Sequence, residues 1–312
     1  MATHVAHRTS VGTLPVGRHA APLPEVRQRS WRLPSRQLLK ELLSWTGLVV
    51  ILGVVVVCVG WRVQGGRWER VETASMGTVA PVGTLLWVKP VDFASLEPGD
   101  FITFSPPSSK DVTYSHRVLR RNADGTILTK GVLSAPDPWH LTEADVIGKV
   151  RMHWWGAGWL LAAAPVLVLG VVAMALAQRL LPKVWKPPAL VLLGSVVLSI
   201  VIVWQRPLVN AQQLAFSPSA GGGADATYVG TGLLPIRVTA ADGQHVELRA
   251  GEVGTVHVAQ ADRAGWLRVT LEPVIRWWWW ALLVGACFVP AFAGTVRGRR
   301  RALEAAAGNL SV

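Results

Sequence analysis

A serine and a histidine about 40 residues apart are the side chains best suited to do chemistry in this chain. Ser75 is followed by Met76, and His116 lies between Ser115 and Arg117, with no cysteine near them. A serine hydroxyl is a poor nucleophile until a neighbour takes its proton, and a neutral imidazole can do so near pH 7. These residue types predict acyl transfer, with Ser75 as the nucleophile and His116 as its base.

The segment that carries His116 has the alternating pattern of a β-strand over residues 112–119. Successive side chains of a strand point to opposite faces. His116 should therefore share a face with Val118, while Ser115 and Arg117 point the other way. We expect the histidine on the interior face, where a base is shielded from water.

The stretch around these residues, 62–155, predicts a small and mostly β domain. It contains short apolar runs separated by turn-forming residues, and it has no helical periodicity. Asn122–Gly125 has the composition of a hairpin turn. The strands that we expect lie at residues 84–88, 101–104, 112–119 and 126–130.

Four apolar segments are long enough to cross a bilayer, which takes roughly 17 to 25 residues. The first lacks a small-x-small cleavage site directly after it, so we interpret it as an uncleaved signal anchor. Many of the 16 tryptophans lie at the ends of these segments, as in an interfacial aromatic belt. The sequence thus predicts a multi-pass α-helical membrane protein with about four spans, at residues 42–61, 156–177, 188–204 and 277–296.

The net charge of +12 is concentrated in three segments. Residues 1–41, 178–187 and 297–312 together carry 14 basic and three acidic residues, whereas the stretches 62–155 and 205–276 carry 17 and 16. By the positive-inside rule the three basic segments are cytoplasmic, as a disordered arm, a loop and a tail. Both termini are then cytoplasmic, and no nucleic-acid partner is expected. A transporter is disfavoured because the predicted spans carry no charged residue in their interiors.

The second extracytoplasmic segment, residues 205–276, predicts a small β unit with a linker. Residues 216–226 are rich in Ser, Gly and Ala, which is typical of a linker. We expect about four strands after it, and we interpret His245 and His257 as surface or packing histidines. The two cysteines, Cys58 and Cys287, lie in predicted spans, so no disulfide framework or metal site is expected outside. The expected strands are residues 236–239, 245–248, 253–258 and 266–271.

Five short motifs between residues 75 and 150 follow one another in an order that closely resembles the type I signal peptidases of the endoplasmic-reticulum and archaeal kind. This Ser-His subclass also occurs in Gram-positive bacteria, and the resemblance covers about residues 42–152. The motifs are Ser75-Met76, Leu96–Phe104, Tyr114–Val118, Thr129–Gly131 with Ala135–Pro138, and Val146–Val150.

The resemblance implies a nucleophile at Ser75, a general base at His116 and an acidic orienting residue at Asp137. It also implies a serine endopeptidase of the cell membrane that removes signal peptides from exported precursor proteins, after small residues at the −1 and −3 positions. The family needs no cofactor and no metal. The lipid bilayer, the precursors and the secretion machinery are the partners that this implies.

The chain departs from the family pattern at two places. Gly77-Thr78 follows Met76 where the family usually has proline at the second position, and Val132 stands where the first family aspartate would be. Two alternatives remain open on the sequence alone. Lys130 could act as the base of a Ser-Lys dyad, or the protein could be a catalytically silent membrane scaffold that keeps the peptidase fold.

Overall fold

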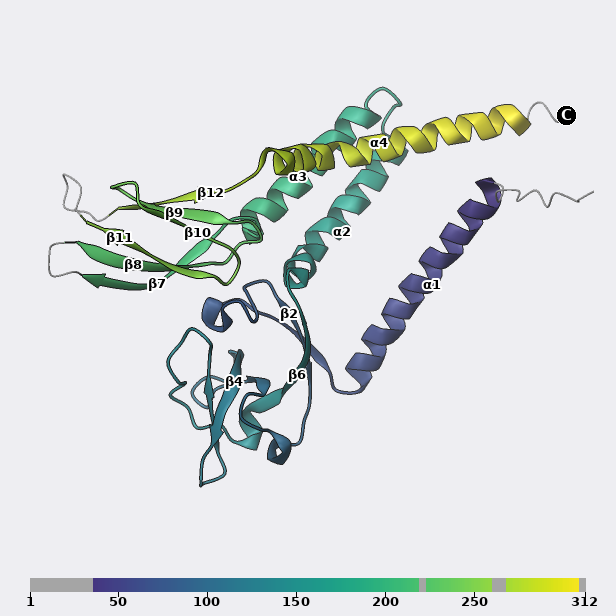
Figure 1. Ribbon diagram of the computed structural model, residues 1–312. Helices are drawn as coiled ribbons and strands as arrows, with labels where there is room; N and C mark the ends of the chain where they lie inside the picture. The colour runs from purple at the N-terminus through teal and green to yellow at the C-terminus, as the bar shows by residue number, and fades with distance from the viewer. Residues whose placement is uncertain (1–35, 219–222, 260–267, 309–312) are drawn as a thin grey trace, which may run out of the picture. The chain divides into compact units, whose positions relative to one another are not determined.

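A computed structural model describes residues 36–218, 223–259 and 268–308, and it divides the chain into two compact units, Met1–Val56 and Val57–Val312. Four long helices are present in the described residues (Figure 1). Each contains 19 to 24 residues that are apolar enough to cross a membrane. These helices support the predicted multi-pass architecture. They are α1 (Arg36–Val63), α2 (Ala157–Leu180), α3 (Lys186–Gln205) and α4 (Trp277–Gly308).

Two predicted boundaries need correction. Helix α1 begins at Arg36, inside the arm predicted for residues 1–41, and α4 continues to Gly308, inside the predicted tail 297–312. Both extensions consist mainly of Arg, Leu, Lys, Glu and Ala, which are good helix formers, so the helix continues beyond the apolar stretch. The remainder of the predicted arm, residues 1–35, and residues 309–312 lie outside the described residues.

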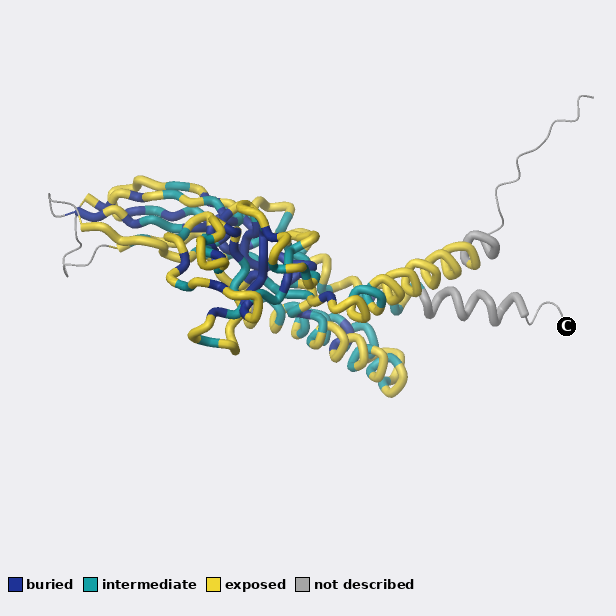
Figure 2. Tube along the Cα trace, turned by 90° about the horizontal axis from the view of Figure 1, so that it is seen from below, coloured by how far each residue is buried: buried dark blue, intermediate teal, exposed yellow. Residues whose placement is uncertain are grey.

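Helices α2, α3 and α4 pack in sequence order, α2 against α3 and α3 against α4. A Cβ atom at Gly170 of α2 would lie 2.5 Å from the side chain of Val197 in α3, so the two helices approach closely at that point. Small residues permit such contacts between membrane helices. Much of the helical surface is apolar and exposed (Figure 2). An exposed apolar surface of this size is what a bilayer would cover.

The segment between α1 and α2 forms one six-stranded antiparallel sheet, and we call this segment the first β domain. Strand β3 coincides with the predicted residues, and β2, β4 and β5 are shifted from their predicted bounds by one or two residues, whereas no strand was predicted at β1 or β6. The strand order is β1-β2-β6-β3-β4-β5. The strands are β1 (Arg67–Arg70), β2 (Leu85–Lys89), β3 (Phe101–Phe104), β4 (Tyr114–Arg121), β5 (Ile127–Lys130) and β6 (Val146–Trp154).

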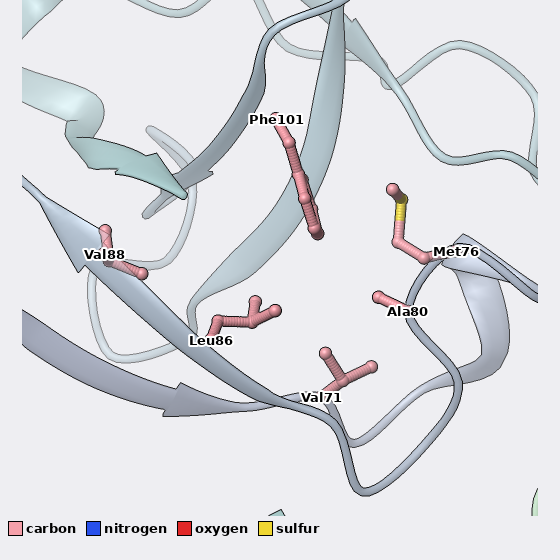
Figure 3. Close-up of a cluster of buried hydrophobic side chains, with 6 residues drawn as sticks. All are labelled: Val71, Met76, Ala80, Leu86, Val88 and Phe101. Carbon is pink, nitrogen blue, oxygen red and sulfur yellow. The ribbon is translucent and has the colours of Figure 1, made fainter. Parts of the chain in front are cut away.

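Two apolar clusters form the core of this domain. In the first, the side chain of Met76 lies with Ala80 and Phe101, while Leu86 and Val71 complete the cluster from the other side (Figure 3). Met76 is only 1% exposed, so the residue after Ser75 is held firmly in the core. The second cluster lies on the β3–β4–β5 side and consists of Leu96, Ile102, Phe104, Val118, Ile127 and Leu141.

In its described residues, the segment between α3 and α4, which we call the second β unit, contains six strands in two three-stranded sheets. The first has the order β11-β8-β7 and the second has the order β10-β9-β12. The strands are β7 (Ala211–Pro218), β8 (Ala224–Gly230), β9 (Ile236–Ala240), β10 (His245–Leu248), β11 (Val253–Val258) and β12 (Val269–Pro273).

The predicted linker at residues 216–226 is wrong where the structure describes it. Its ends belong to β7 and β8, and residues 219–222 lie outside the described residues. Ala224 and Ala226 are fully or almost fully buried and alternate with the exposed Asp225, which is the pattern of a strand with one face packed. The sequence did not reveal this alternation, because alanine and glycine are as common in linkers as in tightly packed sheets.

Candidate active site

Ser75, His116 and Asp137 are joined by two hydrogen bonds. The Nε2 atom of His116 lies 2.9 Å from the Oγ atom of Ser75, and its Nδ1 atom lies 2.7 Å from Oδ2 of Asp137. Each ring nitrogen therefore has one partner. A histidine that donates from Nδ1 to a carboxylate leaves Nε2 free to accept the serine proton. The three residues predicted from the sequence thus lie in the arrangement of a serine-histidine-aspartate triad.

Ser75 is held in place by its two neighbours in the chain. It is the middle residue of a short 3-10 turn, Ala74–Met76, and both flanking side chains are buried. Gly77 follows with a φ of +53°, a value that residues other than glycine rarely adopt. The buried neighbours fix the backbone and the left-handed residue turns the chain sharply, so the Ser75 hydroxyl is presented to His116.

His116 lies in the middle of β4, opposite Ile102 of β3. It is 4% exposed, and Val118 on the same face is also buried, whereas Ser115 is partly exposed and Arg117 is exposed. These burials match the alternation that the sequence predicted. Strand pairing on both sides of β4 fixes the backbone, so the imidazole has little freedom to leave the site.

Asp137 is buried and receives a further hydrogen bond that the sequence did not predict. The hydroxyl of Thr129 donates to Oδ2 of Asp137 over 2.6 Å, and the Asp137 N–H donates to the Thr129 carbonyl oxygen over 2.8 Å. Thr129 is fully buried in β5. These bonds fix both the backbone and the carboxylate of Asp137. The alternation of β5 places Thr129 on the inner face, and this was the available sequence signal.

Residue 131, which follows Lys130, lies too close to Ser75 and His116 to carry a side chain. A Cβ atom at Gly131 would lie 2.9 Å from the carbonyl oxygen of Ser75 and 3.1 Å from Nε2 of His116. A side chain would therefore clash with the Ser75 backbone and crowd the His116 imidazole. The glycine is needed because the chain passes so close to Ser75 and His116.

Thr73 is a second polar residue that the sequence did not predict. Its hydroxyl lies 3.3 Å from the Ser75 hydroxyl, two residues earlier in the chain. A donor at this distance can reach the oxygen of a carbonyl group that Ser75 attacks, where negative charge would develop. The spacing of two residues was visible in the sequence, but an isolated threonine carries no specific pattern.

Lys130, Asp100 and Val132 are not part of this arrangement. In the described part of the chain, Lys130 makes no hydrogen bond or ion pair with Ser75. Asp100 forms an ion pair with Lys149 over 2.5 Å. Burial raises the pKa of Asp100, but the hydrogen bond from Lys149 and that from the Glu97 backbone outweigh this effect, and the pKa lies below its ordinary value. Val132 is exposed and carries no acidic function.

The described residues contain no group of three or more His, Cys, Asp and Glu side chains that could hold a metal ion. His245 and His257 are exposed, and His257 pairs with Asp225 over 2.7 Å. Cys58 and Cys287 are free cysteines on α1 and α4.

No model of a known protein family matches this chain, and no curated protein matches it. A functional assignment therefore depends on the geometry of Ser75, His116 and Asp137 and on the resemblance of the short motifs around them.

Proposed function

We propose that the protein is a membrane-bound serine endopeptidase that removes signal peptides from exported precursor proteins. The observation that carries this proposal is the continuous set of hydrogen bonds from Ser75 through His116 to Asp137. A carboxylate, an imidazole and a hydroxyl in this order are expected where a serine attacks an acyl group.

The reaction would begin when the Ser75 oxygen attacks the carbonyl carbon of the scissile peptide bond. His116 takes the serine proton on Nε2, and Asp137 stabilises the imidazolium that forms. The Thr73 hydroxyl is close enough to donate to the developing oxyanion. His116 then protonates the leaving amine, and the peptide bond breaks to give an acyl-enzyme ester on Ser75. Water hydrolyses the ester with His116 again acting as the base, and Ser75 is regenerated.

The position of the sheet relative to the helices supports a substrate that is itself anchored in a membrane. Strand β6 ends at Trp154 and α2 begins at Ala157, so only two residues separate the first β domain from an apolar helix. The indole rings of Trp87 and Trp154 lie 5.2 Å apart at this end of the sheet. Tryptophans favour the membrane–water interface. A site so close to the bilayer surface suits the cleavage of a peptide bond next to an apolar segment.

Cleavage of detergent-solubilised precursors tests this proposal. The wild-type protein should cut after a small residue, whereas Ser75→Ala and His116→Ala should leave the precursor intact while they retain the wild-type melting temperature. Cleavage by the Ser75→Ala variant at the wild-type rate would refute the assignment.

The alternative is a catalytically silent scaffold that binds exported proteins. The hydrogen-bonded Ser75, His116 and Asp137 argue against it, because binding alone does not require them. The same experiment separates the two functions. A scaffold would bind the precursors without cleaving them, and it would bind them equally well after either substitution.

A further inference from the structure

The turn between β10 and β11 packs directly against the chain that follows the nucleophile. Gly251 in this turn has a φ of +77°, and a Cβ atom there would lie 2.4 Å from the carbonyl oxygen of Gly77 and 2.7 Å from the nitrogen of Thr78. These are backbone atoms, so a side chain at residue 251 would force one of the two loops to move. The second β unit therefore contacts the first β domain two residues after Ser75.

A second contact reaches the residue on the other side of the nucleophile. Val229 of β8 is fully buried and forms one apolar cluster with Ala74 and Val82, against which Trp159 of α2 packs. Ala74 immediately precedes Ser75. Strand β8 and the turn between β10 and β11 thus support the loop that carries Ser75, the strand before Ser75 and the turn after it.

A cavity of about 400 Å³ lies at this contact. Leu133, which lines it, donates its N–H to the carbonyl oxygen of Ser75 over 2.8 Å. A residue that lines the cavity is therefore hydrogen-bonded directly to the backbone of Ser75. Its walls come from both parts of the chain and include Thr78, Val132 and Leu133 from the first β domain and Val246, Glu252 and Val253 from the second β unit.

The chemistry of the walls favours an aliphatic side chain. Four of these residues are valine or leucine, and the charged groups that line the cavity are the carboxylates of Glu247 and Glu252. The hydrogen bond from Arg237 lowers the pKa of Glu247, so this carboxylate is ionised at neutral pH. An acidic side chain in the cavity would lose hydration and meet like charge.

Building on the proposed endopeptidase function, we propose that the second β unit completes the substrate cleft of the Ser75 site. The cavity binds an aliphatic side chain of the extended substrate segment that flanks the scissile bond. Both departures from the family motifs lie at this contact. Gly77-Thr78 is the segment on which Gly251 rests, and Val132 forms part of the apolar wall.

Substitution of Val253 by aspartate tests the cleft, with Leu271→Asp as the matched control. The two side chains are 43% and 44% exposed on strands of the same β unit, and only Val253 lines the cavity. The substrates are precursors with leucine, alanine or aspartate at successive positions on either side of the scissile bond. At one position the wild-type protein and Leu271→Asp should prefer leucine over alanine by about tenfold or more in kcat/KM, and Val253→Asp should lose this preference. A Val253→Asp variant with the wild-type preference overturns the proposal.

A binding measurement in the Ser75→Ala background separates failure of the cleft from failure of the proposed function. Val253→Asp should weaken binding of a leucine-containing fluorescent precursor peptide by about tenfold, whereas Leu271→Asp should not. If this difference appears but no precursor is cleaved, the cleft proposal is supported and the proposed endopeptidase function is refuted. If precursors are cleaved but Val253→Asp binds and cleaves like the control, only the cleft proposal fails.

The contact of Gly251 with Gly77 and Thr78 can be tested with a matched pair of glycine substitutions. Gly251 and Gly243 both have positive φ values in the second β unit, but a Cβ atom at Gly243 would meet nothing within 4 Å. Both alanine variants carry the same backbone strain. Gly251→Ala should lower kcat/KM well below that of Gly243→Ala, because only the former displaces the loop after Ser75. Equal activities of the two variants would show that the turn does not support the site.

Discussion

At the scale of single residues, the sequence identified the three side chains that form the hydrogen-bonded set but not the residues that support them. Ser75 and His116 stood out because their types and neighbours suggested nucleophile chemistry, and Asp137 followed from the motif resemblance. Neither Thr129 nor Thr73 has a residue type or a motif that indicates a role, since threonines in strands and turns are common in proteins. Only the folded chain brings the Thr129 hydroxyl to 2.6 Å from Asp137.

Thr129 should act as a positioning residue for Asp137. Thr129→Val removes the second hydrogen bond to the carboxylate, and we expect kcat to fall by about tenfold with little change in KM, equivalent to about 1.4 kcal/mol. Thr129→Ser should restore most of the rate, because it returns the hydroxyl. Steady-state cleavage kinetics measure both effects.

Thr103→Val is the control for this substitution. Thr103 is also fully buried, but its hydroxyl is bonded to Ser115, which lies on the other face of β4 from His116. This variant should keep the wild-type kcat. Equal losses in the Thr103 and Thr129 variants would mean that the effect reflects general damage to the sheet.

At the scale of elements, alternation and turn composition predicted most strands of both β segments, because their buried faces are lined by large apolar residues. Strands β7 and β8 were missed because the residues at their adjoining ends are small. The three short 3-10 turns were missed as well, since each depends on local hydrogen bonds instead of a periodic pattern. One of these turns carries Ser75, so the element that matters most to the site was invisible in the sequence.

The 3-10 turn Glu143–Asp145 provides a prediction about acid stability. Burial raises the pKa of Asp145, but hydrogen bonds from Lys110 and Thr142 outweigh it, and the pKa lies below its ordinary value. A carboxyl whose folded pKa is lowered stabilises the fold above its unfolded pKa, and this contribution is lost as the pH falls through the lowered value. Asp145→Asn should therefore destabilise the protein by about 1–3 kcal/mol at pH 7. The difference from wild type should shrink below about pH 4.

Thermal unfolding in detergent across this pH range measures the difference. Glu143→Gln is the control, because Glu143 lies in the same turn and is exposed. It should unfold like the wild-type protein at every pH. A constant gap between Asp145→Asn and wild type down to pH 2 would contradict the role of the ionised carboxylate.

At the scale of the whole molecule, composition alone predicted four apolar helices, since long apolar runs have few alternatives to a membrane span. The contact between the second β unit and the loop around Ser75 could not be predicted. It depends on two glycines, Gly77 and Gly251, that are more than 170 residues apart in the chain. Such an approach leaves no periodic signature in either segment.

The charge distribution predicts which side of the membrane each loop occupies. In a variant without Cys58 and Cys287, single cysteines at the exposed positions Ser108, Ala241 and Lys183 can report on the three loops. A membrane-impermeant maleimide should label residues 108 and 241 in intact cells and should label residue 183 only after lysis. Labelling of residue 183 in intact cells would contradict the predicted orientation.

The most direct test of the central claim is whether Ser75 and His116 act as one catalytic unit. Initial rates of cleavage of one precursor should be measured for the wild type, for Ser75→Ala, for His116→Ala and for the double variant. If the two residues act together, each single variant should lose about 10³-fold or more in kcat, and the double variant should be no slower than either. Losses that multiply in the double variant, or a Ser75→Ala variant that still cleaves at the wild-type rate, would contradict the account.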